Sequence, residues 1–451
     1  MRSPGRKLAT LDIREATASE LNFFERPNGG ERAVLVHMDG HTQSVDEAMA
    51  EFGALAESAG ADVVDTIIVR RQRPDSRTFI GRGRVEELAA IIAAGEADLV
   101  LFNHALSPSQ ERNLEQAVGC RVLDRTGLIL DIFAQRARTH EGKLQVELAQ
   151  LRHMSTRLVR GWTHLERQKG GIGLRGPGET QLELDRRMLG IRIKQLERRL
   201  SRVRKQREQG RQSRRRQQLP TVSLVGYTNA GKSTLFNRLT EAQVYADDRL
   251  FATLDTTLRK LETGVAEPVI LADTVGFIRE LPHHLVAAFR STLEEAAQSE
   301  LLLHVVDAAD PNWRDSIRHV ETVLEEIGAA GLPRIRVFNK IDLAGRRPGR
   351  VRDADTGIDE VWMSSVSGEG QDLLLEAIRE QISAERVHGT VRLAPADGRL
   401  RSRLFELGEV LQEETADNGD VLLEVNVRRR DLDRLYEKEG LRAPMQPTPL
   451  R

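Results

Sequence analysis

Cysteine is almost absent from this chain, because Cys120 is the only one among 451 residues. No disulfide can form within the chain, and a zinc site with C-x-x-C spacing is excluded. Long apolar runs are missing as well: no stretch approaches the roughly eighteen residues of a membrane helix, and the N-terminus lacks the apolar core of a signal peptide. These absences predict a protein of the reducing cytoplasm.

An overall charge of one sign is also missing, since 67 Lys and Arg face 68 Asp and Glu, for a formal net charge of −1. This balanced total hides an uneven distribution of charge along the chain. Residues 125–216 contain 24 Lys and Arg but only 9 Asp and Glu, so the rest of the chain is acidic. Such an excess favours a polyanionic partner, most commonly nucleic acid, although a charge run can also be a solvated face.

The length exceeds what one hydrophobic core supports and predicts two to four domains. Residues 1–125 alternate strand-like apolar runs with amphipathic helical patterns, which is typical of a small α/β domain with a parallel or mixed sheet. Residues 386–451 are expected to form a small βαβ-like C-terminal domain. Its helix is predicted near residues 400–414, a strand follows at VLLEVNV, and a last helix is predicted near residues 430–439.

Residues 126–218 show long helical periodicity instead. Apolar residues with 4,3 spacing in segments 144–165 and 189–203 predict an antiparallel helical hairpin with coiled-coil packing. Between them lies GGIGLRGPG, residues 170–178, whose five glycines and one proline suit neither helix nor strand. This segment is predicted to be the hairpin tip.

Residues 219–385 alternate strands and helices and contain the motifs that indicate chemistry. The strand TVSLVG is followed by G-x-x-x-x-G-K-S and a helix, which is a P-loop in its required context. Backbone N–H groups of such a loop close around phosphates, and the helix N-terminus adds partial positive charge. Lys232 is expected to reach the β- and γ-phosphates, and Ser233 to ligate Mg²⁺. The loop residues predicted to bind nucleotide are Gly226, Tyr227, Thr228, Asn229, Ala230, Gly231, Lys232, Ser233 and Thr234.

Two later segments complete the predicted phosphate and metal site. Asp273 ends an apolar run and is expected to hold Mg²⁺ through water, with the Gly276 N–H near the γ-phosphate. Thr253 lies in an expected switch loop and would give the metal a second hydroxyl; the alternative is an ordinary loop residue. Lys232, Thr253 and Gly276 are the catalytic candidates. The nucleotide-binding candidates in these segments are Phe251, Ala252, Thr253, Leu254, Asp255, Asp273, Thr274, Val275 and Gly276.

The sequence Asn339-Lys340-Ile341-Asp342 indicates which base is bound. An Asp342 carboxylate can accept hydrogen bonds from the ring N1–H and the exocyclic amino group of guanine. Adenine offers neither, so GTP is favoured over ATP. Asn339 would hold the loop and the base edge, and the Lys340 stem would cover the ring. Ser364, Ser365 and Val366 are expected to complete the base pocket with backbone donors.

Two residues bear on the rate of hydrolysis. Phe277 stands where many small GTPases have the glutamine that orients water, so we expect slow intrinsic hydrolysis that a partner accelerates by ordering segments 247–257 and 276–290. Asn229 has two readings: it helps coordinate K⁺, as in several GTPases that this loop resembles, or it stabilises the loop turn.

Together these motifs resemble the GTP-binding domain of translation-factor-class GTPases. GYTNAGKS, FATLD and DTVGFI, preceded by GGIGLRGPGETQLE on a basic helical arm, resemble the HflX family, a branch near the Obg GTPases, over roughly residues 30–385. The resemblance implies a cytoplasmic GTPase that binds the large ribosomal subunit, with its arm reaching toward the peptidyl transferase region, and that splits or rescues stalled ribosomes. A monomer is expected.

The arm is expected to recognise folded RNA by shape and charge. Arg175 at the tip, beside Gly171 and Gly173, would contact phosphates, and little aromatic interleaving accompanies the basic rows. Two other functions stay open. One is a signalling GTP switch whose arm binds a protein or an acidic membrane surface. The other is an ATP-dependent RNA-remodelling enzyme with an unconventional nucleotide site in the N-terminal domain.

Overall fold

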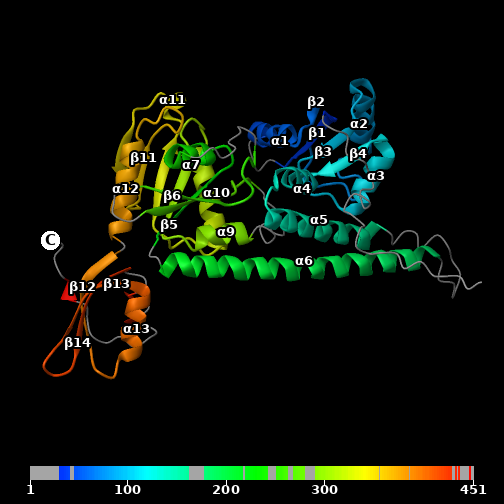
Figure 1. Ribbon diagram of the computed structural model, residues 1–451. Coiled ribbons are helices and arrows are strands. Elements are labelled where there is room, and N and C mark those ends of the chain that lie inside the picture. Colours follow the sequence, from blue (N-terminus) through cyan, green and yellow to red (C-terminus); the bar gives the residue numbers. More distant parts are fainter. Residues whose placement is uncertain are drawn as a thin grey trace, which may run out of the picture.

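The chain is described from a computed structural model, in which three sheets are arranged along one long helix (Figure 1). The structure describes residues 30–40, 45–161, 177–216, 219–241, 250–262, 268–279, 290–354, 356–384, 386–428, 432–433, 435–436 and 446–447. In that part of the chain, no helix is both long enough and apolar enough to cross a bilayer.

The N-terminal region is the predicted small α/β domain. Its four strands are all parallel, in the order β2-β1-β3-β4. Alternate residues of β1 enter opposite cores: Leu35 packs with Phe52 on one face, and Val36 packs with Leu88 on the other. Helices therefore cover both faces, as a parallel sheet requires. The elements are β1 (Arg32–Asp39), α1 (Val45–Ala59), β2 (Asp62–Arg70), α2 (Arg82–Gly95), β3 (Leu99–Phe102), α3 (Pro108–Val118) and β4 (Arg121–Asp124).

Three helices follow this domain: α4 (Arg125–Arg136), α5 (His140–Gly161) and α6 (Pro177–Arg216). Helix α4 packs into the N-terminal core through residues such as Phe133. Helices α5 and α6 form the predicted hairpin, whose seam joins Leu144, Leu148 and Leu151 to Leu189, Leu196 and Leu200. The 40 residues of α6 extend about 60 Å and run beneath both α/β domains (Figure 1). We call α5 and α6 together the basic arm.

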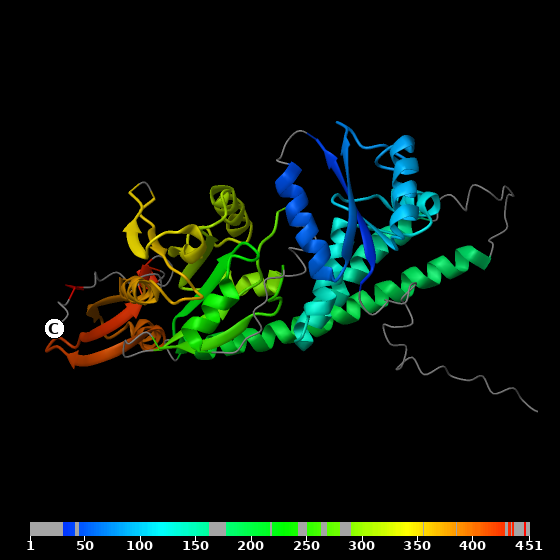
Figure 2. The same cartoon turned by 90° about the horizontal axis from the view of Figure 1, so that it is seen from above.

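The third region is a mostly parallel, seven-stranded sheet in the order β10-β11-β9-β8-β5-β7-β6, with antiparallel edge strands. The predicted α/β fold with a mostly parallel sheet in the third region is thus confirmed. Seen from above, this third domain and the N-terminal domain lie side by side along α6 (Figure 2). Its elements are β5 (Thr221–Gly226), α7 (Lys232–Thr240), β6 (Thr257–Leu261), β7 (Val269–Asp273), α9 (Arg290–Ala297), β8 (Leu301–Asp307), α10 (Trp313–Glu326), β9 (Arg334–Asn339), α11 (Ile341–Ala344), β10 (Gly349–Arg352), β11 (Asp359–Trp362) and α12 (Gln371–Ala384).

The C-terminal domain differs in detail from the predicted βαβ-like unit, because its sheet is antiparallel, in the order β13-β14-β12-β15. The helix predicted to reach residue 414 ends at Leu407, and β13 follows at once. An Asn418-Gly419 turn, with Gly419 at φ 85°, pairs β13 with β14, and this hairpin overrides local helix propensity. The helix predicted at 430–439 falls mostly outside the described residues. The elements are β12 (Arg386–Leu393), α13 (Gly398–Leu407), β13 (Gly408–Thr415), β14 (Val421–Arg428) and β15 (Gln446–Pro447).

Candidate active site

The P-loop joins β5, which is buried along its whole length, to the N-terminus of α7. Two of its glycines are required by close approach. A Cβ at Gly226 would lie 2.2 Å from the Val305 carbonyl oxygen, and one at Gly231 would lie 2.2 Å from Asn339 Nδ2. Both also have positive φ, which L side chains rarely adopt. The loop is therefore pressed against β8 and β9, and Gly231 is the N-cap of α7.

Lys232 lies inside this loop rather than in solvent. Its ammonium group donates hydrogen bonds to the carbonyl oxygens of Gly226, at 3.1 Å, and Tyr227, at 2.6 Å. Burial lowers the pKa of Lys232 to about 8, Asp273 opposes that shift, and Lys340 adds to it. A buried cation held mainly by carbonyl groups gains much from an anion such as a phosphate.

Ser233, Thr253 and Asp273 converge from three different segments. The Ser233 and Thr253 hydroxyl oxygens lie 2.7 Å apart, and they lie 2.8 and 3.0 Å from Asp273 Oδ2. Burial raises the pKa of Asp273, although Ser233 and Lys232 oppose the shift. Its second oxygen, Oδ1, is buried without a hydrogen-bond partner in the described part of the chain. Oxygen ligands of this kind suit Mg²⁺, which keeps waters and substrate phosphates as its other ligands.

Gly276 lies close to two residues of the P-loop, Thr228 and Lys232. A Cβ there would meet Thr228 Cγ2 at 2.8 Å and Lys232 Nζ at 2.9 Å. The following residue, Phe277, is 3% exposed and packs in a core cluster with Val225. Its backbone N–H donates to the Gly226 carbonyl and its carbonyl accepts from Thr228 N–H. Phe277 therefore fixes this segment to the P-loop and offers no polar side chain to a water molecule.

The base-pocket candidates gather around Asn339. Its amide nitrogen donates to the Ala230 carbonyl at 2.9 Å, and its oxygen accepts from the Ser365 N–H and hydroxyl at 2.9 and 2.8 Å. Asn339 thereby joins the P-loop to the loop of residues 364–366. Lys340 has φ 64° and forms an ion pair with Asp307 at 2.7 Å.

The other base-pocket candidates divide by exposure. Asp342 and Val366 are exposed, where a base can reach them. Ile341 is buried, and the Ser364 hydroxyl accepts from Ser367 N–H, so these two side chains hold the pocket's own loops.

Several predicted nucleotide-binding residues direct their side chains elsewhere. Phe251 and Leu254 are 2% exposed and lie in the core cluster of the N-terminal domain, where the Phe251 ring meets Phe133 edge to face at 4.7 Å. Val275 joins the same cluster, and the Thr274 hydroxyl donates to the Leu224 carbonyl. Their side chains therefore join domains and strands.

Tyr227 and Asp255 also face the N-terminal half of the molecule. The Tyr227 hydroxyl donates to Glu51 of α1 and accepts from Arg279 N–H at 2.7 Å. Burial and the Glu51 carboxylate raise the pKa of Tyr227. The Asp255 carboxylate accepts from the residues that precede α5, including Thr139.

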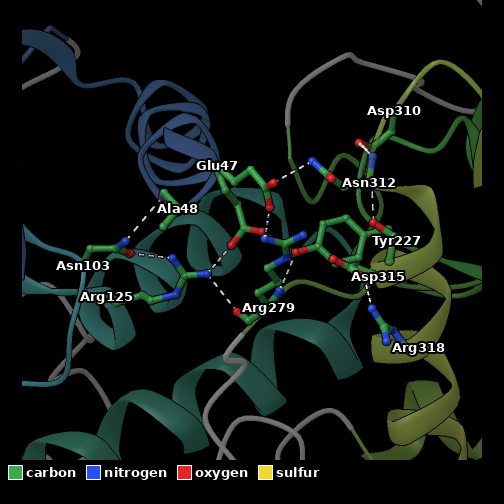
Figure 3. Close-up of polar contacts among 12 residues, drawn as sticks. Glu47, Ala48, Asn103, Arg125, Tyr227, Arg279, Asp310, Asn312, Asp315 and Arg318 are labelled. Atoms are coloured by element: carbon green, nitrogen blue, oxygen red, sulfur yellow. Dashed lines mark hydrogen bonds and ion pairs between the residues drawn. The ribbon is translucent and has the colours of Figure 1, made fainter. Parts of the chain in front are cut away.

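A polar cluster between the domains was not foreseen from the sequence (Figure 3). Arg279 donates to Glu47 at 2.8 Å, and Asn312 donates to the other oxygen of Glu47 at 2.7 Å. Arg125 is 5% exposed and donates to Asn103, Glu51 and the Arg279 carbonyl. The partners are more than 150 residues apart in several of these pairs, so no local pattern could have indicated them.

The N-terminal domain has a cavity of about 130 Å³ at the carboxyl ends of β1 and β3, beside this cluster. His37, Asn103, His104 and Arg125 are among its lining residues. Its volume is below the roughly 300 Å³ at which ligand pockets usually begin.

The P-loop, the oxygen cluster and the Asn339 loop on a mostly parallel sheet define a P-loop GTPase. Curated relatives agree: GTPase HflX of Escherichia coli is 57% identical over 419 residues, 92% of this chain and 98% of the relative. GTPase HflX of Magnetococcus marinus is 45% identical, over 87% of this chain and 91% of the relative. The chain belongs to the HflX GTPase family and is a GTP-hydrolysing enzyme, as its motifs predicted.

Family models match the chain along most of its length. Those described as GTP-binding GTPase N-terminal and Middle Region match residues 46–134 and 136–214. Those described as 50S ribosome-binding GTPase and HflX C-terminal domain match residues 221–340 and 351–447. Among solved structures, a GTP-binding protein from Sulfolobus solfataricus in complex with GDP aligns with a TM-score of 0.43 at 24% identity, over 78% of this chain and 98% of that one.

Proposed function

We propose that this GTPase binds the large ribosomal subunit through its basic arm and acts in splitting or rescuing stalled ribosomes. The observation that carries the proposal is a row of exposed cations along α6. A match to the family model described as a 50S ribosome-binding GTPase supports the same partner. The exposed basic side chains of α6 are Arg186, Arg187, Lys194, Arg198, Arg199, Arg202, Arg204 and Lys205.

Charged side chains of the arm fall into two groups, those that pair across the seam and those that are exposed. Ion pairs across the seam hold α5 to α6: Arg152 with Glu197 at 2.6 Å, and Arg207 with Glu141 at 2.7 Å. Among the α6 residues whose exposure is described, Glu197 is the only exposed acid, so the exposed surface of this helix is strongly positive. Such a row contacts the phosphates of folded RNA without reading bases. The tip candidates Arg175, Gly171 and Gly173 lie outside the described residues and remain predictions.

Nucleotide binding is proposed to follow the predicted roles. Lys232 would reach the β- and γ-phosphates, Gly276 N–H would meet the γ-phosphate, and Asp342 would read guanine. Ser233, Thr253 and Asp273 would hold Mg²⁺. When bound, Mg²⁺ neutralises charge on the phosphate oxygens. The unpartnered Asp273 Oδ1 and the two adjoining hydroxyls support this assignment.

Hydrolysis by the chain alone is proposed to be slow, because the buried Phe277 side chain cannot orient water. Asn229 has φ 58°, a conformation that asparagine tolerates better than most residues, which supports its role in the loop turn. The K⁺ hypothesis for Asn229 has a direct test. Equal turnover in potassium and sodium buffers would remove it.

The central experiment measures GTP turnover with and without purified large ribosomal subunits across a salt series. We expect stimulation that Lys232→Ala abolishes and that fades with rising salt, since each phosphate contact releases a counterion. A variant with alanine at Arg198, Arg199 and Arg202 should bind subunits more weakly and with a salt slope shallower by about 3. If large subunits leave GTP turnover unchanged, the arm must bind a different partner.

The control for that variant removes the same charge from outside the arm. It carries alanine at Arg347, Arg379 and Arg399, which are exposed in the GTPase and C-terminal domains. We expect it to keep the wild-type salt slope. Sedimentation with ribosomes that survives RNase treatment would favour a protein or membrane partner instead.

A further inference from the structure

Asp255 connects the expected switch loop to the start of the basic arm. Its Oδ2 accepts hydrogen bonds from the backbone N–H groups of Arg138, at 2.9 Å, and Thr139, at 2.8 Å. Its Oδ1 accepts from the Thr139 hydroxyl at 2.6 Å. These donors immediately precede α5, where the helix dipole favours a negative charge. One carboxylate of the GTPase domain thus binds the N-terminus of an arm helix.

Thr139 both caps the N-terminus of α5 and binds Asp255. Its hydroxyl accepts the Gly142 N–H at 2.9 Å, which caps α5, while it donates its proton to Asp255. Gly142 itself is tightly enclosed, because a Cβ there would lie 2.1 Å from Asp255 Oδ1. Any side chain at residue 142 must therefore displace either the Asp255 carboxylate or the first turn of α5.

Asp255 is separated from the oxygen cluster by a single residue. Thr253 contacts Ser233 and Asp273, Leu254 is 2% exposed in the N-terminal core, and Asp255 binds the arm. Because Leu254 is anchored between them, we expect a shift of α5 relative to the GTPase domain to move Thr253. The basic arm and the expected metal ligand share one short, doubly anchored segment.

We propose that the contact between Thr139 and Asp255 positions Thr253, so that RNA bound to the arm sets the GTPase site through this contact. The proposal rests on the ribosome-binding function proposed above. Thr139 and Asp255 are positioning residues in this scheme, because they act through Thr253. Sites coupled in this way typically change each other's binding affinity 5- to 150-fold.

Gly142→Ala separates this proposal from a merely structural role. Alanine favours a helix over glycine, but its Cβ displaces the Asp255 carboxylate, so a merely structural role predicts a change in thermal stability with unchanged stimulation. Loss of positioning predicts that stimulation of kcat by large subunits falls about tenfold, while KM for GTP changes less than about twofold. Gly190→Ala in α6 is the matched control, because nothing lies within 4 Å of a Cβ there. It should keep full stimulation.

Thr139 gives a second, chemically graded test. Thr139→Ala removes the hydroxyl and should lose stimulation as Gly142→Ala does, whereas Thr139→Ser keeps the hydroxyl and should restore it. Thr156→Ala is the control on the same helix, since its hydroxyl bonds only the His153 carbonyl among the described groups. Full stimulation of both Gly142→Ala and Thr139→Ala would overturn the proposal.

A readout independent of turnover is amide hydrogen exchange at Arg138 and Thr139, whose N–H groups bind Asp255. Their protection should change between the GDP form and the form with a non-hydrolysable GTP analogue, and Gly142→Ala should erase the difference. Identical exchange in both forms would contradict the proposal. Absence of stimulation in the wild type would instead refute the ribosome-binding function, so the two failures are distinguishable.

Discussion

The nucleotide face and the interdomain face of the GTPase domain are built from the same short motifs. Thr253 and Asp273 point into the oxygen cluster, whereas Asp255 and Val275, each two residues further on, point into the N-terminal half. In the P-loop, Lys232 faces the phosphate site and Tyr227 binds Glu51. The motifs of this chain therefore carry two kinds of information, ligand contact and domain contact, interleaved residue by residue.

The largest expected effect tests the nucleotide face. Lys232→Met should lower GTP turnover about a thousandfold, because a positioned cation is lost from the transition state. Its free energy of unfolding should not fall, since burial disfavours the charged form of Lys232. A single-turnover assay measures the rate of GTP hydrolysis, and urea unfolding measures the free energy of unfolding. A large loss of stability would place Lys232 among the structural residues.

The converse is expected on the interdomain face. Phe251→Ala should lower the free energy of unfolding by about 3 kcal/mol, because a fully buried ring leaves a cavity against Phe133. GDP affinity of the folded protein should change little, since the ring does not face the phosphates. Leu411→Ala is the surface control, at 50% exposure. A large fall in GDP affinity with unchanged stability would reverse the assignment of Phe251.

A smaller effect is expected from Tyr227→Phe, which removes only the hydroxyl between Glu51 and Arg279 N–H. The loss should be about 1 kcal/mol of unfolding free energy. A double-mutant cycle with Glu51→Gln should show coupling between the two side chains. Additive effects would mean that this bond does not hold the domains together.

The last effect is a pH dependence. The pKa of Lys232 is about 8 in the folded protein and near 10.5 when exposed, so between these values the unfolded chain binds more protons. The free energy of unfolding of the nucleotide-free protein should therefore rise as pH rises from about 8, relative to Lys232→Met. Parallel pH profiles of the unfolding free energy for the two proteins would show that burial does not lower the pKa of Lys232.

The sequence predicted the chemistry better than the contacts. The P-loop context indicated Lys232 and Ser233, which the structure places in the loop and beside Asp273, and the 4,3 leucine spacing found the hairpin seam of α5 and α6. It missed strand β13, because an Asn-Gly turn and cross-strand pairing outweigh a helical pattern. It also missed every contact of the interdomain cluster, since Glu47 and Arg279 show nothing in their neighbourhoods that points to each other.

By itself, the sequence determined the nucleotide class, the basic arm and the alternation of strands and helices, because each depends on residue types at fixed local spacing. Only the tertiary structure decided which motif residues face the nucleotide and which face the N-terminal domain. That choice depends on where β7 and the 250–255 segment emerge against α1, α4 and α5. Contacts of this kind arise from the packing of whole domains, and packing leaves no periodic trace in the chain.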